Sequence, residues 1–407
     1  MMKTITLKPI LKYLGLSGLV TGMIILGMSW VDKYHSPPVA GINDTASTTS
    51  RNSPLLGVGI TPKKDLKPMP VYNHWENFTT RDGLPGDKVN CVKVDGNRVW
   101  AGTENGLALL ENGKVSRVYT TQDGLAHRGV LFVDVNKVTG DVWIATLAGL
   151  NVLSAGRFDT YNQFNSGLPN DLVYMVSCDG NDIWVATGGG AGHLDTHTGV
   201  WEIFTEINAP MHEPWTYAVS ANQGVVYIAA WGGGIIEYNF RTRHFRDYTD
   251  PDGEMELDLY PNDGPVHDIT TAAYLSNGIL WVSTYFGISR YDGTTWSGYF
   301  DSDSGLASNF VNFLKANGDV GYVCTDNGLS SFNGDTWVTY RIDDTTKVGE
   351  VIITKDKKVR KIRTNFRIAN NFTWGVDFQG DDVWVATSHG LSHGWRTAGS
   401  TVEKPSM

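Results

Sequence analysis

The sequence predicts an all-β fold, a seven-bladed β-propeller of four-stranded antiparallel blades, with one N-terminal transmembrane helix. Three observations predict the propeller. A W-x-x-T-like motif followed by a turn that ends in glycine recurs along the chain; its copies are 43, 41, 43, 54, 41 and 62 residues apart; and turn residues separate the β-prone runs around each copy. A period of about 41 to 43 residues is the signature of a repeat architecture. The copies begin at Trp100, Trp143, Trp184, Tyr227, Trp281, Tyr322 and Trp384.

Each repeat supplies the strands of one antiparallel sheet. An apolar strand such as 89–94 leads through a Gly/Asn/Asp turn into the W-x-x-T strand, a third strand follows, and an aromatic segment such as the one ending at Tyr119 is the fourth. Turns of this chemistry between short β-prone runs indicate hairpins. The W-x-x-T strand is apolar or small on both faces, so its sheet must be covered on both sides. Radial packing of seven sheets satisfies this requirement.

The repeats resemble a known family. The pattern G-L-P-x-x-x-V at Gly83–Val89, followed by W-x-G-T-x-x-G-L at Trp100–Leu107, is similar to the two-component regulator propeller repeat, and the resemblance extends roughly from Trp75 to Trp395. In that family such propellers commonly form the extracytoplasmic sensing part of membrane-bound hybrid sensor kinases. Because the sequence ends at Met407 without a kinase, receiver or DNA-binding module, we expect a stand-alone propeller that shares the fold and not the signalling output.

The N-terminal region predicts membrane attachment. Residues 1–12 contain Lys3, Lys8 and Lys12 and are expected in the cytoplasm, and the uncharged run 13–31 is long enough to span a hydrocarbon core. A cleaved signal peptide is the alternative interpretation of 13–31. Residues 32–69, rich in Ser, Thr, Pro and Gly, predict a flexible linker, and 398–407 a polar tail. The propeller, 70–397, then lies in the periplasm or outside the cell.

The two ends of the repeat region predict how the ring closes. The aromatic strand 71–79 precedes the first complete meander and has no blade of its own, whereas the last repeat lacks an aromatic outer strand. Pairing the two would complete the seventh blade and remove two exposed edges.

Two insertions interrupt the period. The first, 250–268, is acidic; the second, 341–367, is basic, and their positions in the repeat predict both on one face of the ring beside the sixth blade. Within the second, β-prone runs 351–354 and 359–362 flank a charged tip, which predicts a protruding two-stranded ribbon that needs cover from the ring, from the acidic insertion or from another chain. Its basic residues are candidate partner contacts: Lys357, Lys358, Arg360 and Lys361.

Further candidate binding residues lie in the loops before the inner strands and after W-x-x-T, which should surround one mouth of the central channel. They are His127, Arg128, Asp171, His212, Glu213, Trp215, Trp231, His267, Asp268, Tyr285, Trp374 and His389. The three loop histidines before inner strands, with nearby carboxylates, are raw material for a metal site or a general base. Equivalent positions on different blades, however, stand on a circle around the channel, often too far apart to share one ion.

Composition and motifs limit the function. A formal charge of −10 argues against general nucleic-acid binding. The sequence contains no haem, zinc, phosphate-loop or nucleophile motif, and Cys91, Cys178 and Cys324 are expected to be buried hydrophobes, so we expect no cofactor, no metal and no catalysis. The favoured hypothesis is a membrane-anchored, extracytoplasmic protein-binding or scaffold subunit of an envelope complex. The alternatives are a glycan-sensing module with a separate signalling partner and a metal-assisted lyase or hydrolase.

Overall fold

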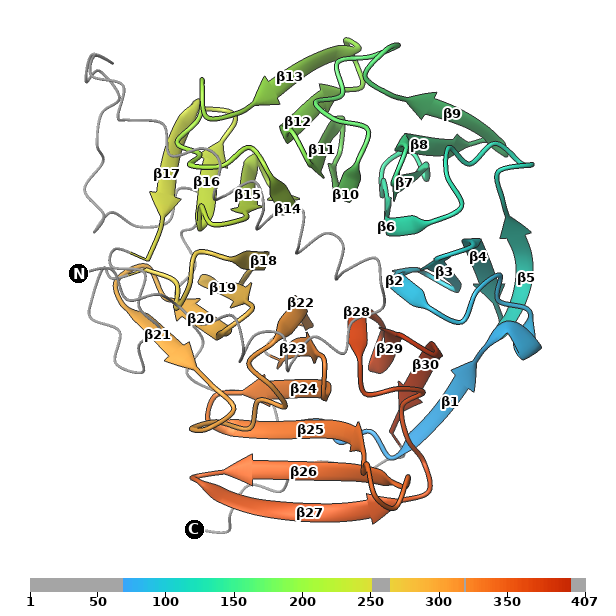
Figure 1. Cartoon of the computed structure of the whole chain (residues 1–407), viewed down its shortest axis with the longest axis vertical. Helices are drawn as coiled ribbons and strands as arrows, with labels where there is room; N and C mark the ends of the chain where they lie inside the picture. The colour runs from blue at the N-terminus through green and yellow to red at the C-terminus, as the bar shows by residue number, and fades with distance from the viewer. Residues whose placement is uncertain (1–68, 251–263, 318–319, 397–407) are drawn as a thin grey trace, which may run out of the picture. The chain divides into compact units, whose positions relative to one another are not determined.

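The structure, a computed structural model, describes residues 69–250, 264–317 and 320–396. In this part of the chain seven antiparallel sheets stand radially around a central channel, so the predicted seven-bladed propeller is confirmed (Figure 1). No helix among the described residues is long and apolar enough to cross a bilayer. The predicted span 13–31, the basic segment before it, nearly all of the linker, most of the acidic insertion and the polar tail lie outside the described residues.

Each blade is a meander that runs outward from the channel. Blade 1 contains β2 (Val89–Asp95), β3 (Arg98–Thr103), β4 (Gly106–Glu111) and β5 (Lys114–Tyr119). Blade 2 contains β6 (Val130–Val135), β7 (Val142–Thr146), β8 (Gly149–Ser154) and β9 (Arg157–Tyr161). Blade 3 contains β10 (Val173–Asp179), β11 (Asp182–Thr187), β12 (Gly190–Asp195) and β13 (Val200–Phe204). Blade 4 contains β14 (Thr216–Asn222), β15 (Val225–Ala230), β16 (Ile235–Asn239) and β17 (His244–Tyr248).

Blade 5 follows the same plan, whereas blades 6 and 7 depart from it. Blade 5 contains β18 (Thr270–Ser276), β19 (Ile279–Thr284), β20 (Gly287–Tyr291) and β21 (Trp296–Tyr299). Blade 6 has six strands: β22 (Val311–Asn317), β23 (Val320–Thr325), β24 (Gly328–Asn333), β25 (Thr336–Ile342), β26 (Gly349–Lys355) and β27 (Lys358–Thr364). Blade 7 contains β28 (Thr373–Gln379), β29 (Asp382–Thr387), β30 (Gly390–Trp395) and, from the other end of the chain, β1 (His74–Phe78), which a short 3₁₀ turn (Thr80–Asp82) follows.

The W-x-x-T motif recurs because both of its named residues fasten the blade. In six blades the threonine hydroxyl donates to the carbonyl of the glycine that ends the next turn, at 2.6–3.0 Å, as Thr103 does to Gly106. In five blades the tryptophan ring lies 5.4–6.1 Å from the aromatic ring of the outer strand, as Trp100 does from Tyr119. The motif therefore fixes one hairpin turn and the packing between the second and fourth strands.

The ring closes through β1. This strand pairs antiparallel with β30 from His74↔Trp395 to Phe78↔Leu391. Just before it, Tyr72 is buried between blades 6 and 7, where its hydroxyl lies 2.6 Å from that of Tyr322. The N-terminal and C-terminal ends of the repeat region thus share one sheet, in which β30 is paired on both sides.

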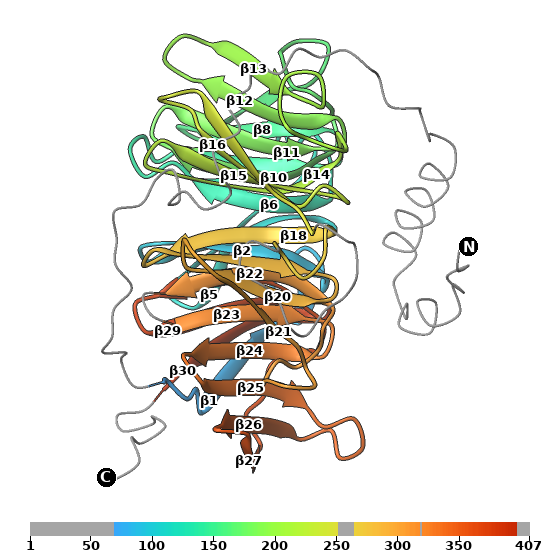
Figure 2. The same ribbon diagram turned by 90° about the vertical axis from the view of Figure 1, so that its left-hand side faces the viewer.

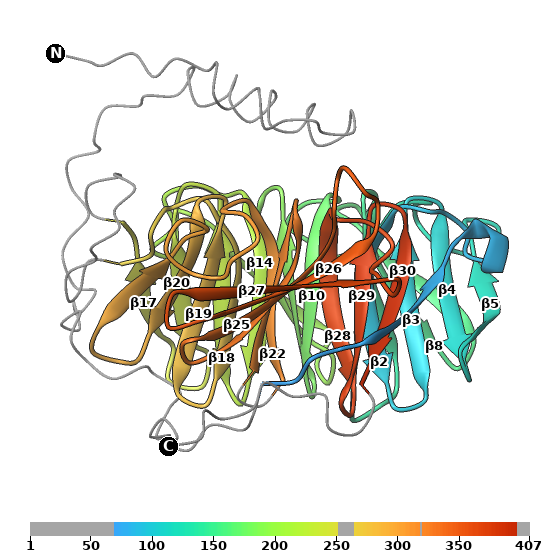
Figure 3. The ribbon, with the colours of Figure 1, turned by 90° about the horizontal axis from the view of Figure 1, so that it is seen from below.

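The basic insertion forms the predicted two-stranded hairpin, but the predictions that it protrudes and that it lies on the loop-bearing face of the ring were wrong. β26 and β27 extend the sheet of blade 6 beyond β25, and the hairpin lies across the outer wall of the ring (Figures 2 and 3). The reason is burial: Val351 is buried, and Ile353 and Ile362 pack against a cluster that includes Tyr72 and Tyr340. A ribbon free of β25 would expose these side chains to water.

Candidate functional site

We call the face at which the inner strands begin the loop face. Two of its predicted histidines, His127 and His267, have a structural role. The Nδ1 atom of His127 accepts the backbone N–H of Gly129 at 2.9 Å, and that of His267 accepts the N–H of Ile269 at 3.0 Å. The equivalent side chains in three other blades accept the same bond: Asn170, Ser308 and Asn370. The histidines are thus two of several residue types that close one recurrent turn.

The predicted aspartates that follow also hold loops. Oδ1 of Asp171 accepts the backbone N–H of Gln163 at 2.8 Å, and Oδ1 of Asp268 accepts that of Asp250 at 2.8 Å. Burial raises the pKa of Asp268, an effect that this N–H and the charge of His212 oppose. Each aspartate ties the loop from the preceding blade to the start of the next inner strand, so these carboxylates are partly committed to the fold.

The other predicted polar residues of this face are more open to solvent. His212, Glu213, Arg128 and His389 are exposed, and among the described residues the His389 ring lies 3.4 Å from Asn370 Nδ2. Glu213, three residues before β14, is the equivalent of His127 and His267, so His212 is one position out of register with them. The described residues contain no group of three His, Cys, Asp or Glu side chains that could hold a metal ion.

His267 makes the ring sensitive to acid. Its burial, with its ring 4.2 Å from that of Phe286, lowers its pKa from 6.5 to about 4. The unfolded chain therefore binds a proton more readily, and the free energy of unfolding should fall by about 1–3 kcal/mol as the pH drops from 6.5 to 4. His267→Asn keeps a turn acceptor, as at Asn170, and should remove this component in urea unfolding measured across that range. An unchanged pH dependence in His267→Asn, or an equal change in the exposed control His212→Asn, would contradict the assignment.

The loop face carries a continuous arc of aromatic side chains over blades 3 to 6. The rings of Trp215 and Tyr217 are 6.3 Å apart and nearly parallel, Tyr217 lies 5.1 Å from Trp231, and Trp231 lies 5.6 Å from Tyr285. Tyr174 stacks on Tyr217 at 4.9 Å, and Phe310 stacks on Tyr285 at 4.2 Å. The structure therefore brings together three predicted residues, Trp215, Trp231 and Tyr285. We call these six half-buried side chains the aromatic arc: Tyr174, Trp215, Tyr217, Trp231, Tyr285 and Phe310.

Trp374, the fourth predicted aromatic, is not a member of the arc. Its Nε1–H donates to Ser388 at 2.9 Å, and the Lys88 ammonium lies 4.6 Å from its ring. The predicted basic residues Lys357, Lys358, Arg360 and Lys361 are exposed on the outer hairpin, far along the sheet from the channel.

The sequence analysis did not predict the β-bulges that place two members of the aromatic arc, Tyr174 and Tyr217. All seven inner strands have a β-bulge at their second residue, where one residue has no partner in the adjacent strand: Asn90, Leu131, Tyr174, Tyr217, Thr271, Asn312 and Trp374. Bulges redirect side chains and are common beside functional sites. Here Asn90 reaches the carbonyl of Val130 in the next blade at 2.8 Å, whereas blades 3 and 4 place tyrosines at this position.

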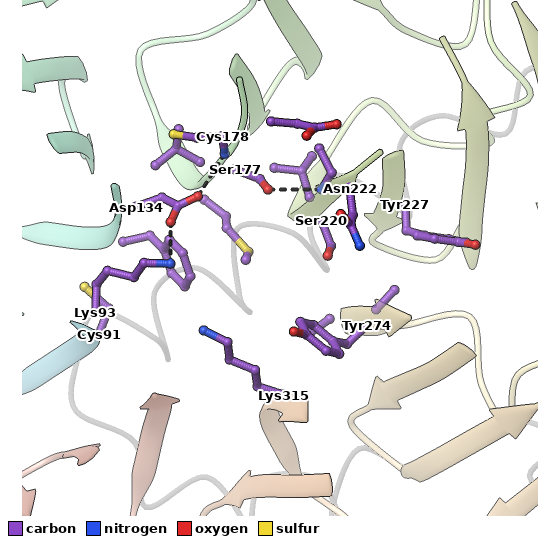
Figure 4. Close-up of a pocket in the computed structure, with 18 of the residues that line it drawn as sticks. Cys91, Lys93, Asp134, Ser177, Cys178, Ser220, Asn222, Tyr227, Tyr274 and Lys315 are labelled. Atoms are coloured by element: carbon purple, nitrogen blue, oxygen red, sulfur yellow. Dashed lines mark hydrogen bonds and ion pairs between the residues drawn. The ribbon is translucent and has the colours of Figure 1, made fainter. Parts of the chain in front are cut away.

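A separate cavity of about 460 Å³ occupies the channel near its other face (Figure 4). It is lined by the third to seventh residues of the inner strands and by turn residues of the opposite face, such as Lys137 and Val138. Phe132 and Phe313, from blades 2 and 6, meet across the channel with ring centroids 5.9 Å apart. Of the three cysteines, Cys178 is only half-buried here, whereas Cys91 and Cys324 are buried. None of the predicted site residues lines this cavity.

The fifth residues of the inner strands form a polar ring in the channel. In blade order they are Lys93, Asp134, Ser177, Ser220, Tyr274, Lys315 and Asp377. Lys93 Nζ lies 2.6 Å from Asp134 Oδ1, and Lys315 Nζ lies 2.7 Å from Asp377 Oδ1. Burial raises the pKa of Asp377, but Lys315 and Lys93 outweigh it and hold that pKa below its usual range. The four charged residues lie on consecutive blades, 6, 7, 1 and 2.

No protein-family model matches the sequence, and no curated protein matches it. Solved structures share the fold. The extracellular domain of a hybrid two-component system from B. thetaiotaomicron aligns with a TM-score of 0.59 at 17% identity, over 79% of this chain and 42% of that one. The extracellular domain of a one-component system from the same organism aligns with a TM-score of 0.58 at 17% identity, over 79% of this chain and 40% of that one. This chain thus spans about two fifths of the length of those domains.

A third similar structure is an enzyme. Virginiamycin B lyase from Staphylococcus aureus aligns with a TM-score of 0.54 at 14% identity, over 79% of this chain and 98% of that one. At identities this low, the structural similarity establishes a shared fold only. It supports the resemblance of the repeats to the two-component regulator propeller as a resemblance of fold.

Proposed function

We propose that this chain is an extracytoplasmic binding module, anchored through residues 13–31, and that its loop face docks a protein partner in an envelope complex. The observation that carries the proposal is the aromatic arc. The repeat does not require it, because blades 1 and 2 have Lys88, Asn90, Gly129 and Leu131 where blades 3 and 4 have Leu172, Tyr174, Trp215 and Tyr217. Tryptophan and tyrosine are enriched in protein interfaces and among the residues that contribute most to affinity.

Two other observations support this role. The similar structures include extracellular domains of two-component and one-component systems, which favours an extracytoplasmic location. Two of the three loop histidines, His127 and His267, and both loop aspartates are engaged in turns, which favours binding over catalysis. In this proposal the basic side chains of β27 and its tip supply a second, electrostatic contact that speeds association and depends on salt.

The experiment is quantitative capture from detergent-solubilised membranes with purified variants. Trp215→Ala and Trp231→Ala should each weaken the recovered association about tenfold or more, since truncating such an aromatic costs about 2 kcal/mol or more. Val138→Ala, on the opposite face and 76% exposed, is the control and should leave it unchanged. A partner that binds all three variants equally well would place the interface elsewhere, and a monomer without a stoichiometric partner would contradict the proposal.

Glycan sensing is the second candidate function, because the apolar faces of sugar rings also pack on aromatic side chains, and the members of the aromatic arc are only half-buried. A glycan at 100 times its Kd would add about 2.7 kcal/mol to the free energy of unfolding. A thermal-shift panel should then show stabilisation that Trp231→Ala abolishes, and a flat response to all glycans would remove this candidate.

A further inference from the structure

The channel cavity is chemically asymmetric. Its charged half is lined by Lys315, Lys93 and Asp134, with Asp377 behind them as the ion-pair partner of Lys315, and its neutral half by the hydroxyl run Ser177, Ser220 and Tyr274. In Figure 4 Lys315 extends into the cavity from blade 6, and Tyr274 directs its hydroxyl into the same space from blade 5. The two halves meet where these two side chains are neighbours in blade order.

The carboxylates of the charged half are committed to the ring. Oδ2 of Asp134 accepts the N–H of Cys178 in the next blade at 2.8 Å, and Oδ1 accepts the N–H of Val135 at 2.9 Å as well as Lys93. Asp377 likewise accepts the N–H of Val94 at 2.9 Å and that of Phe378 at 3.0 Å in addition to Lys315. Every oxygen of these two carboxylates therefore already has a donor.

The cavity in contrast has donors to spare. An ammonium group has three N–H donors, and among the described residues Lys315 has one acceptor, Asp377. That acceptor also interacts with Lys93, which lies between two carboxylates. Burial lowers the pKa of Lys315, and Asp377 only partly offsets it. The hydroxyls of Tyr274 and Ser220 have no hydrogen-bond partner among the residues that the structure describes, so they too can donate.

The inner end of the cavity is apolar. Phe132, Met175 and Phe313 line it below the polar ring, and the contact between the two phenylalanine rings narrows the channel there. The volume lies within the usual range for small-molecule pockets.

We propose that the channel cavity binds a small organic carboxylate, with the carboxylate on Lys315 and Tyr274 and the apolar part of the molecule against Phe132, Met175 and Phe313. The anion supplies acceptors for these donors, and it pairs with the Lys315 ammonium, whose hydrogen-bonded carboxylate, Asp377, also interacts with Lys93. A purely inorganic anion would leave the apolar end unused, and a neutral aromatic would leave the ammonium unsatisfied. This site is distinct from the loop face, so it stands whether or not a protein docks there.

The test uses the whole chain in detergent and ¹⁹F NMR of two matched probes, 4-fluorobenzoate and its neutral amide, 4-fluorobenzamide. The carboxylate should bind at least about tenfold more tightly than the amide. A hydrogen bond to a charged group contributes a binding free energy that corresponds to a tenfold or larger difference in Kd. Lys315→Met should remove this preference, Tyr274→Phe should reduce it several-fold, and Lys137→Met, an exposed lysine at the cavity mouth, should preserve it.

Several results would overturn the proposal. They are equal binding of the two probes, no binding of 4-fluorobenzoate to the folded chain, competition by inorganic phosphate as effective as that by benzoate, or equal losses in Lys137→Met and Lys315→Met. Should Lys315→Met fail to fold, Tyr274→Phe decides alone, because it keeps the ion pairs of the ring intact. Retained carboxylate preference in a folded Tyr274→Phe with unchanged affinity would then contradict the assigned carboxylate position. Loss of partner capture in Trp231→Ala with unchanged fluorobenzoate binding would separate this site from the proposed docking function.

Discussion

Replacing Trp75 with alanine is expected to lower the free energy of unfolding by about 3–5 kcal/mol, the range for a large buried aromatic side chain. Trp75 is 7% exposed, with its ring 6.0 Å from that of Tyr72 and 5.5 Å from that of Tyr340. It lies opposite Gly394 in the pairing of β1 with β30, and a Cβ on that glycine would stand 2.6 Å from the Trp75 ring. One side chain thus joins the closing strand to blades 6 and 7.

Urea unfolding measures this loss. Far-UV circular dichroism is the signal, because it reports the backbone and does not depend on the tryptophan that the substitution removes. Phe164→Ala is the matched control, because Phe164 is 97% exposed and its truncation should change the free energy of unfolding by less than about 0.5 kcal/mol. A Trp75→Ala ring as stable as the parent would mean that the seam contributes little and that other contacts close the propeller.

Replacing Asp377 with alanine is expected to cost about 3–5 kcal/mol, since it leaves a buried ammonium without its carboxylate. Lys315 loses its ion-pair partner, and the N–H groups of Val94 and Phe378 lose their acceptor. Adding Lys315→Met to Asp377→Ala should recover part of the loss, because the unpaired charge is then gone. The surface pair of Arg396 and Asp381, 2.8 Å apart with Asp381 77% exposed, is the control, and Asp381→Ala should cost less than about 1 kcal/mol.

The pH dependence gives the same prediction a second readout. The pKa of Asp377 is lower in the folded chain than its usual value of 3.8, so its stabilising contribution is complete above that value. The contribution is lost as the pH falls through the lowered pKa, and Asp377→Asn should lack this acid-labile component. If Asp377→Ala and Asp381→Ala are equally mild, the charged ring does not stabilise the channel.

The repeat made most of the fold predictable. Threonine and tryptophan of W-x-x-T recur because each makes the same contact in most blades, and such contacts leave a periodic trace in the sequence. The position of the basic hairpin was predicted wrongly because its apolar residues pack in a cluster with Tyr72, a residue about 280 positions earlier in the chain. The local sequence of the hairpin does not distinguish this packing from a free ribbon. Tertiary contacts, and not local β-propensity, determine that β26 pairs with β25.

The candidate sites were predictable to different degrees. Trp215, Trp231 and Tyr285 could be placed from their positions next to strand ends, and the structure brings them together. His127 and His267 attracted a chemical interpretation because a bond from a backbone N–H to Nδ1 leaves no sign in the sequence. The channel ring had a usable signal: aligned by their first residues, the inner strands have a charged side chain at the fifth position in four blades, directly after an apolar fourth residue. Because an unpaired buried charge is costly, charged residues of opposite sign at equivalent positions of neighbouring inner strands indicate ion pairs between blades.

Site-specific photocrosslinking in native membranes tests the central claim, that the loop face docks a protein, most directly. A benzophenone amino acid is placed singly at Trp231 on the aromatic arc, at Val138 on the opposite face and at Lys361 on the outer hairpin. The account predicts one discrete protein adduct from position 231, absent from position 138 and absent again when Trp215→Ala is added. Adducts only from position 138 or 361, or none from 231 in membranes where the chain is intact, would contradict it.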